Sequence, residues 1–148
     1  MPVDHLHALT ELAAHFQGYD LSRTVVVSPD LGNAKAAAAF ARMLGVDVAV
    51  GAKQRFSDDR VVISSVIGEV AGRDIIVLDD EIARGTTLVE LLERLRERGA
   101  GPVRIACTHG LFADGALARL DSQPDVLEIV CTNTVAIGKE LSVPKLRV

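Results

Sequence analysis

The chain has 148 residues, of which 49% are hydrophobic, 3% aromatic and 24% charged, and its formal net charge is -4 at pH 7. A chain of this length and hydrophobicity can bury a core without disulfides or a structural metal. The negative charge and the scarcity of aromatic side chains argue against nucleic-acid binding, which uses basic surfaces and stacking platforms.

The chain shows no sign of a membrane segment or a secretory leader. No apolar run approaches membrane-spanning length, and Met1 leads into a polar segment instead of a basic and then apolar one. We therefore expect a cytoplasmic protein with no membrane contact. Cys107 and Cys131 lie in or beside expected strands without metal-type spacing, and we interpret both as reduced core residues.

Helix and strand signals alternate along the chain. Apolar residues at helical spacing predict an opening helix over 4–17. Three further helices are expected over 34–44, 87–98 and 115–120, and strands over 24–27, 46–50, 61–67, 75–78, 103–107 and 126–131. This alternation predicts βαβ units, and hence one α/β domain over 1–148: a three-layer α/β/α sandwich with a mainly parallel sheet.

The run over 75–87 carries the strongest functional signal. Four apolar residues lead to the adjacent acids Asp79 and Asp80, and a Gly/Thr loop over 84–87 then opens a helix. Open α/β sheets bind ligands at the carboxyl ends of their strands. The loop amides and the helix dipole favour a phosphate, while the two acids suit sugar hydroxyls or hydrated magnesium. An acidic residue and a Thr can also simply cap a helix, so the pair alone would be ambiguous.

A second loop repeats this design after the strand over 24–27. The strand ends at Asp30, a turn with Gly32 follows, and a helix starts at Ala34. Alone, such a turn is also an ordinary helix start. If both loops flank the switch point of the sheet, one could hold a sugar phosphate and the other a pyrophosphate or a bridging metal.

These motifs resemble the phosphoribosyl-binding signature of type I phosphoribosyltransferases. Over essentially the whole chain, the resemblance is closer to the carboxyl-terminal half of ribose-phosphate pyrophosphokinases. It is carried, in the order of that family, by residues 3–6, 25–35, 53–55, 67–72, 79–87, 98–100, 108–112 and 132–134.

The resemblance implies an enzyme that transfers the diphosphoryl group of ATP to ribose 5-phosphate, with magnesium as cofactor. The product is 5-phosphoribosyl diphosphate (PRPP), and the family assembles as homo-oligomers. The family's amino-terminal domain, which supplies much of the ATP site, has no counterpart here. We therefore expect these 148 residues to bind the sugar phosphate but to have little diphosphokinase activity alone.

The resemblance also implies residue roles. Ribose 5-phosphate would be held by Asp79, Asp80, Arg84, Gly85, Thr86 and Thr87. The diphosphate loop would be Asp30, Leu31, Gly32, Asn33 and Ala34, with Asp30 as the magnesium ligand. Lys53 and Arg55 match a basic pair on the family's mobile catalytic loop, where they would stabilise transition-state charge; a solvated surface loop over 53–60 is the alternative. We assign no catalytic histidine and interpret His109 as a turn or packing residue.

Three residues depart from the commoner family pattern. Glu81 stands where an apolar residue is usual, and Arg84 and Thr86 replace smaller residues. Two alternatives therefore remain. One is a free-standing phosphoribosyltransferase that uses PRPP, although no segment is spare enough to form the hood that reads a base. The other is a non-catalytic regulatory subunit that pairs with an active partner.

Overall fold

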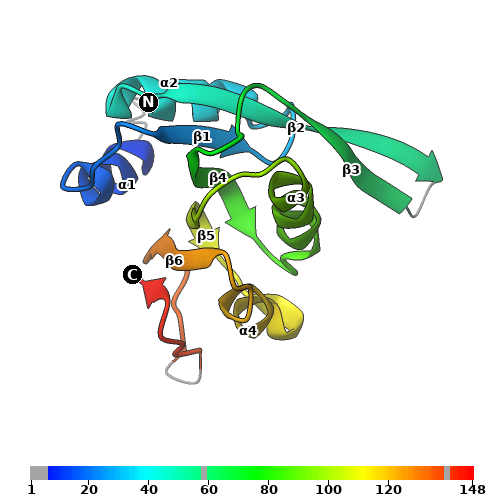
Figure 1. The fold of residues 1–148 in the computed structure, drawn as a ribbon. Helices are drawn as coiled ribbons and strands as arrows, with labels where there is room; N and C mark the ends of the chain where they lie inside the picture. The colour runs from blue at the N-terminus through cyan, green and yellow to red at the C-terminus, as the bar shows by residue number, and fades with distance from the viewer. Residues whose placement is uncertain (1–6, 58–59, 139–140) are drawn as a thin grey trace, which may run out of the picture.

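A computed structural model describes residues 7–57, 60–138 and 141–148, and its described strands form one seven-stranded sheet in the order β3-β2-β1-β4-β5-β6-β7 (Figure 1). In chain order the elements are α1 (Leu9–Phe16), β1 (Thr24–Ser28), α2 (Ala34–Leu44), β2 (Asp47–Ser57), β3 (Arg60–Ile67), β4 (Asp74–Ile82), α3 (Thr86–Glu97), β5 (Val103–Gly110), η1 (Ala113–Gly115), α4 (Ala116–Asp121), β6 (Val126–Thr132) and β7 (Leu146–Arg147). Neighbouring strands run parallel except β2 and β3, which are antiparallel.

Strands β1 and β4 lie at the centre of the sheet. β1 pairs in parallel with β4, from Thr24 opposite Asp74 to Val27 opposite Val77, and with β2 on its other side. Every residue of β1 is buried, as are the four residues over 75–78 of β4. Continuous buried runs of Val and Ile are typical of parallel strands that are covered on both faces.

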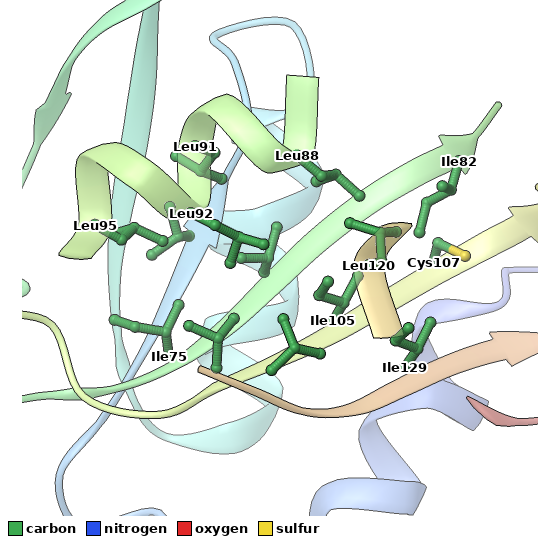
Figure 2. Packing of buried hydrophobic residues seen from close by; sticks show 14 of the residues in the cluster. Ile75, Ile82, Leu88, Leu91, Leu92, Leu95, Ile105, Cys107, Leu120 and Ile129 are labelled. Atoms are coloured by element: carbon green, nitrogen blue, oxygen red, sulfur yellow. The ribbon is translucent and has the colours of Figure 1, made fainter. Parts of the chain in front are cut away.

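Helices cover both faces of this sheet. Residues alternate along β1, so that Val26 packs with α1 and α2 while Val25 and Val27 pack with α3 and α4. On the first face, the rings of Phe16 and Phe40 meet edge to face with centroids 6.2 Å apart. On the other face, Figure 2 shows the apolar side of α3 packed on the sheet, through Leu88, Leu91, Leu92 and Leu95. The predicted three-layer α/β/α sandwich with a mainly parallel sheet is confirmed.

In the polar stretch over 53–60, residues 53–57 and 60 were wrongly predicted as a loop, and residues 58–59 lie outside the described part of the chain. β2 continues through Lys53 to Ser57 and β3 begins at Arg60, so both strands enter one long antiparallel hairpin that extends beyond the other strands (Figure 1). An antiparallel ribbon is held by backbone hydrogen bonds and does not need an apolar face along its whole length. A hydrophobicity pattern therefore could not detect the continuation of β2 through this polar stretch.

Other boundaries also differ from the predictions. α1 begins at Leu9, and residues 4–6 of the expected opening helix lie outside the described part of the chain. β4 and β5 run to Ile82 and Gly110, so His109 lies on a strand instead of in a turn; its Nδ1 is 2.8 Å from the hydroxyl oxygen of Thr134. The two-residue strand β7 was not predicted, because it is too short to show a pattern.

The two cysteines lie side by side in the core. Cys107 of β5 and Cys131 of β6 are register partners, and both are buried free thiols, as predicted. The hydrogen bond with Cys131 and burial raise the pKa of the Cys107 thiol. Across the described ranges, we find no helix with both the length and the apolar character needed to cross a bilayer.

Candidate functional site

The parallel pairing of β1 and β4 brings the two predicted loops to one edge of the sheet. Asn33, in the loop after β1, donates a hydrogen bond from Nδ2 to the carbonyl oxygen of Leu78 on β4, at 2.9 Å. The carboxylates of Asp30 and Asp79 are close enough for the charge of one to affect the titration of the other. The Asp30 loop and the Asp79–Asp80 pair of β4 therefore form one site.

The acidic pair lies within β4, before the strand ends at Ile82. The backbone N–H of Asp80 donates to Oδ1 of Asp79 at 3.0 Å, and Asp79 is half-buried whereas Asp80 is exposed. Burial, a hydrogen bond with the Asp80 side chain and the nearby negative charges of Asp80 and Asp30 raise the pKa of Asp79 from 3.8 to about 7. The ionised form of Asp79 thus lacks a compensating positive charge, which a bound cation would provide.

A hollow of about 310 Å³ lies beside this pair. It is lined by Asp79 and by residues 81–88, which include the turn into α3. Gly85 precedes the helix with φ of +69°, a left-handed conformation that strains residues with a side chain. Among the described residues, no acceptor pairs with the amides of Gly85, Thr86 or Thr87. The hollow therefore combines free N–H donors with the positive end of the α3 dipole, the combination that binds phosphate.

A second hollow, of about 250 Å³, lies on the other side of the acidic pair. Asp79, Asp80 and Asn33 line it together with Thr108 of β5 and His7, which precedes α1. Asp79 thus lines both hollows. Sequence reasoning did not find Thr108 or His7 as site residues: residues 108–112 contributed to the family resemblance without a role for Thr108, and His7 lies far from the two loops in the sequence.

In the loop after β1, each carboxylate oxygen of Asp30 has its own partner. Oδ1 of Asp30 accepts a hydrogen bond from the backbone N–H of Asn33 at 3.1 Å, and Oδ2 forms an ion pair with Nζ of Lys53 at 2.6 Å. Burial alone would raise the pKa of Asp30, but the Lys53 ammonium and the Asn33 amide lower it below its usual value. The turn also includes the exposed residues Leu31 and Gly32 and leads into α2 at Ala34.

Lys53 reaches this turn from β2. Close packing makes the approach possible: a Cβ on Gly51 would lie 2.6 Å from the carbonyl oxygen of Pro29, so only Gly fits there. Arg55 lies two residues further along β2, and its side chain is outside the described part of the structure. The structure therefore brings Lys53, but not the Arg55 side chain, into contact with the Asp30 loop.

The carboxylates of the site suit a magnesium ion that is held by few protein ligands. Over the described ranges, no group of three or more His, Cys, Asp or Glu residues is arranged to hold a metal ion. Magnesium, however, commonly binds through one or two carboxylates and completes its shell with water and substrate phosphates. Asp30 and Asp79, two hard oxygen donors whose charges repel each other, suit that mode.

Sequence reasoning also missed a contact that supports the loop over 84–87, here called the phosphate-type loop. Arg119 of α4 donates from Nη1 to the carbonyl oxygen of Arg84 at 2.6 Å. The Arg84 side chain is itself paired, through Nε, with Oδ2 of Asp114 at 3.0 Å. Arg119 and Asp114 follow the loop by some thirty residues, and nothing in their local pattern indicates this contact.

We predict that the substitution Asp79→Asn stabilises the protein at neutral pH. A folded pKa of about 7 against 3.8 means that the folded state holds an extra proton between these values, so stability falls as pH rises from about 4 to about 7. Asn removes this penalty and should raise the free energy of unfolding by at least about 1 kcal/mol at about pH 8, with no gain below about pH 4. Urea unfolding across this range measures the difference.

Asp20→Asn is the matched control for this prediction. The backbone and hydroxyl of Ser22 lower the pKa of Asp20, so neutralising Asp20 brings no gain at high pH. Equal unfolding free energies for wild type and Asp79→Asn across the range would contradict the raised pKa of Asp79.

Sequence comparisons agree on one family. Residues 54–148 match the family model described as the phosphoribosyl synthetase-associated domain. A Streptomyces coelicolor protein assigned as a ribose-phosphate pyrophosphokinase is 73% identical over 148 residues, which are 100% of this chain and 47% of that protein. The ribose-phosphate pyrophosphokinase of Corynebacterium efficiens is 44% identical over 94% of this chain and 44% of its own length.

Solved structures point the same way. The phosphoribosylpyrophosphate synthetase from Mycobacterium smegmatis matches with a TM-score of 0.88 and 36% identity, over 99% of this chain and 47% of that one. The purine phosphoribosyltransferase from Pyrococcus horikoshii, at 20% identity, shares the fold with a TM-score of 0.60 over 84% of this chain and 80% of its own. The chain spans about half the length of the curated relatives it matches. It belongs to the ribose-phosphate pyrophosphokinase family of transferases and carries the phosphoribosyl synthetase-associated domain.

Proposed function

We propose that this chain is the half of a ribose-phosphate diphosphokinase that binds ribose 5-phosphate and PRPP. In the whole enzyme, the diphosphoryl group of ATP would pass to the anomeric hydroxyl of the sugar. One observation carries the proposal: the amides of Gly85, Thr86 and Thr87 have no acceptor among the described residues, and these three residues line a hollow that Asp79 also lines. A ligand with a phosphate at one end and hydroxyls at the other suits both sets of groups.

Each end of the sugar phosphate would meet different chemistry, the phosphate in the 310 Å³ hollow and the ribose at the acidic pair beside it. The phosphate would accept hydrogen bonds from the amides over 85–87 and from the Thr86 and Thr87 hydroxyls, in the favourable field of the α3 dipole. Asp80 and Asp79 would accept hydrogen bonds from ribose hydroxyls. Charge-assisted hydrogen bonds of this kind are each worth about 1.5–3 kcal/mol.

Magnesium would be held by Asp30, with Asp79 as a second oxygen donor. The ion would neutralise charge on the diphosphate oxygens. Asp79 would have to lose its proton to serve as a ligand, and its raised pKa means that this occurs near neutral pH. The residues over 30–34 would surround the diphosphate, with Asn33 fixing the turn against β4.

Lys53 and Arg55 would act on the charge that develops during transfer. The contact of Lys53 with Asp30 supports this role, because it places a cation at the turn where the diphosphate would lie. When diphosphate binds, the ammonium can shift from the Asp30 carboxylate to the transferred group. Phosphoryl transfer spreads negative charge over oxygens, and a positioned Lys lowers the barrier by stabilising it.

The remaining parts of the proposal concern the whole protein. ATP binding and homo-oligomerisation are carried over from the family resemblance alone, and this chain spans 47% of the Streptomyces coelicolor relative. The phosphoribosyltransferase alternative rests on relatives at 20% identity or below, which share the fold alone. The regulatory alternative rests on Arg84 and Thr86, and an absence of sugar-phosphate binding would favour it.

We predict that Thr87→Val and Asp80→Asn each weaken ribose 5-phosphate binding about tenfold or more. Each substitution removes one hydrogen-bonding group or one charge while keeping the shape of the side chain, and a tenfold loss corresponds to about 1.4 kcal/mol. Isothermal titration calorimetry of the chain, with and without magnesium, measures the affinities. Thr10→Val, on the exposed side of α1, is the control and should bind as the wild type does. Wild-type affinity in both site variants would refute the proposed binding mode.

We predict that Lys53→Met separates binding from chemistry. In a longer protein that contains this domain and carries out the transfer, the turnover should fall by a factor of about 100 or more, because the lost interaction is strongest in the transition state. The affinity for ribose 5-phosphate should change less than about threefold. Arg42→Met, at the exposed end of α2, is the control. Full turnover of Lys53→Met would make Lys53 a surface residue and remove it from the mechanism.

A further inference from the structure

Arg119 does not line the 310 Å³ hollow, yet it contacts the loop that does. We propose that Arg119 is a positioning residue of this loop: it fixes the peptide group between Arg84 and Gly85 so that the Gly85 N–H faces the hollow. The inference deepens the proposed function and rests on it, since the loop has a phosphate to bind only if that function holds.

The Arg119 guanidinium donates two hydrogen bonds, one to the loop and one to its own segment. Arg119 lies on α4 and is half-buried. Its Nη1 donates to the carbonyl oxygen of Arg84 at 2.6 Å, and its Nη2 donates to the carbonyl oxygen of Asp114 at 3.1 Å. The planar fork of Arg fixes directions as well as distances, which a Lys ammonium does not.

The direction of the Arg84 carbonyl determines the direction of the Gly85 amide. In a planar trans peptide, the C=O and N–H groups point to opposite sides. Because Arg119 holds the Arg84 oxygen toward α4, the Gly85 N–H is directed away from α4. That N–H has no acceptor among the described residues, and Gly85 lines the hollow.

This peptide needs an external restraint. Gly85 has φ of +69°, and Gly adopts left-handed and right-handed conformations with similar ease. A Gly-flanked peptide can therefore rotate at little cost and present its carbonyl oxygen to the hollow in place of its N–H. An inward carbonyl would repel a phosphate, so the orientation of this one peptide decides whether the loop attracts or rejects an anion.

Residues 114–120, around Arg119, pack against the loop over 84–87. A Cβ on Gly85 would lie 3.5 Å from Ala116 and from Leu120, so α4 packs directly against this position. The Asp114 carboxylate pairs with the Arg84 side chain at 3.0 Å. Asp114 itself has φ of +52°, which is uncommon for a residue other than Gly. Side chains of this segment thus contact the loop, and none of them lines the 310 Å³ hollow.

The test compares Arg119→Met with Arg73→Met in the 148-residue chain. Arg73 is a matched control, because its Nε and Nη2 also donate to two carbonyl oxygens, those of Arg23 and Thr24, each at 3.1 Å. These bonds lie at the amino ends of β1 and β4, opposite to the site. Both variants should lose thermal stability, since each removes two such hydrogen bonds and Arg73→Met also removes the ion pair of Arg73 with Asp47.

Two readouts distinguish positioning from simple stabilisation. In ligand-free 15N–1H spectra, Arg119→Met should shift or broaden the amide resonances over 85–87, and Arg73→Met should leave them unchanged. The affinity for ribose 5-phosphate should fall about tenfold in Arg119→Met only. If Arg119→Met does not fold, Arg119→Lys, which keeps the charge and loses the planar fork, replaces it with the same expectations.

Wild-type spectra over 85–87 and wild-type affinity in the Arg119 variant would overturn the inference, as would equal changes in Arg73→Met. If wild type does not bind ribose 5-phosphate, the proposed function fails. The ligand-free spectra then decide by themselves whether Arg119 orients the loop.

Discussion

The parallel pairing of β1 with β4 is the constraint on which the site depends. Parallel neighbours end at the same edge of a sheet, so the two loops that follow them must lie together. The hydrogen bond from Asn33 to the carbonyl oxygen of Leu78 fixes their separation. Asp30 and Asp79, which are far apart in the sequence, become electrostatic neighbours for this reason alone.

The negative charge at this edge is balanced only in part. Lys53 neutralises Asp30, and Asp79 takes up a proton instead of a cation. A site with this balance is prepared for a ligand that brings its own cation, such as a magnesium-bound diphosphate. The uncompensated charge of ionised Asp79 is the physical reason that we place metal and substrate together in the proposed mechanism.

Contacts from other elements hold the site in place, which consists of the Asp30 loop with Lys53, the acidic pair of β4 and the phosphate-type loop. α3 begins at the phosphate-type loop and also contacts the hairpin that carries Lys53: Oε2 of Glu90 accepts a hydrogen bond from the backbone N–H of Ile63 on β3, at 3.3 Å. α4 supports the phosphate-type loop through the hydrogen bond from Arg119 to the carbonyl oxygen of Arg84. One helix thus joins the sugar-phosphate end of the site to its basic end.

The sequence could predict whatever depends on local pattern. Buried strands such as β1 and β4, the helices and the two loops at strand ends follow from hydrophobic periodicity and Gly placement. The strands over 46–50 and 61–67 were predicted in this way, but the continuation of β2 through residues 53–57 could not be, since that part of the hairpin is held by backbone hydrogen bonds and is polar in sequence. The role of Arg119 was missed because its contact with the loop over 84–87 is long-range and leaves no local pattern in the sequence.

A crystal structure of the chain with ribose 5-phosphate tests the central claim most directly. The account predicts a phosphate group within hydrogen-bond distance of the amides over 85–87 and ribose hydroxyls facing Asp79 and Asp80. A sugar phosphate bound elsewhere on the molecule, with these amides and acids making no contact to it, would contradict the account.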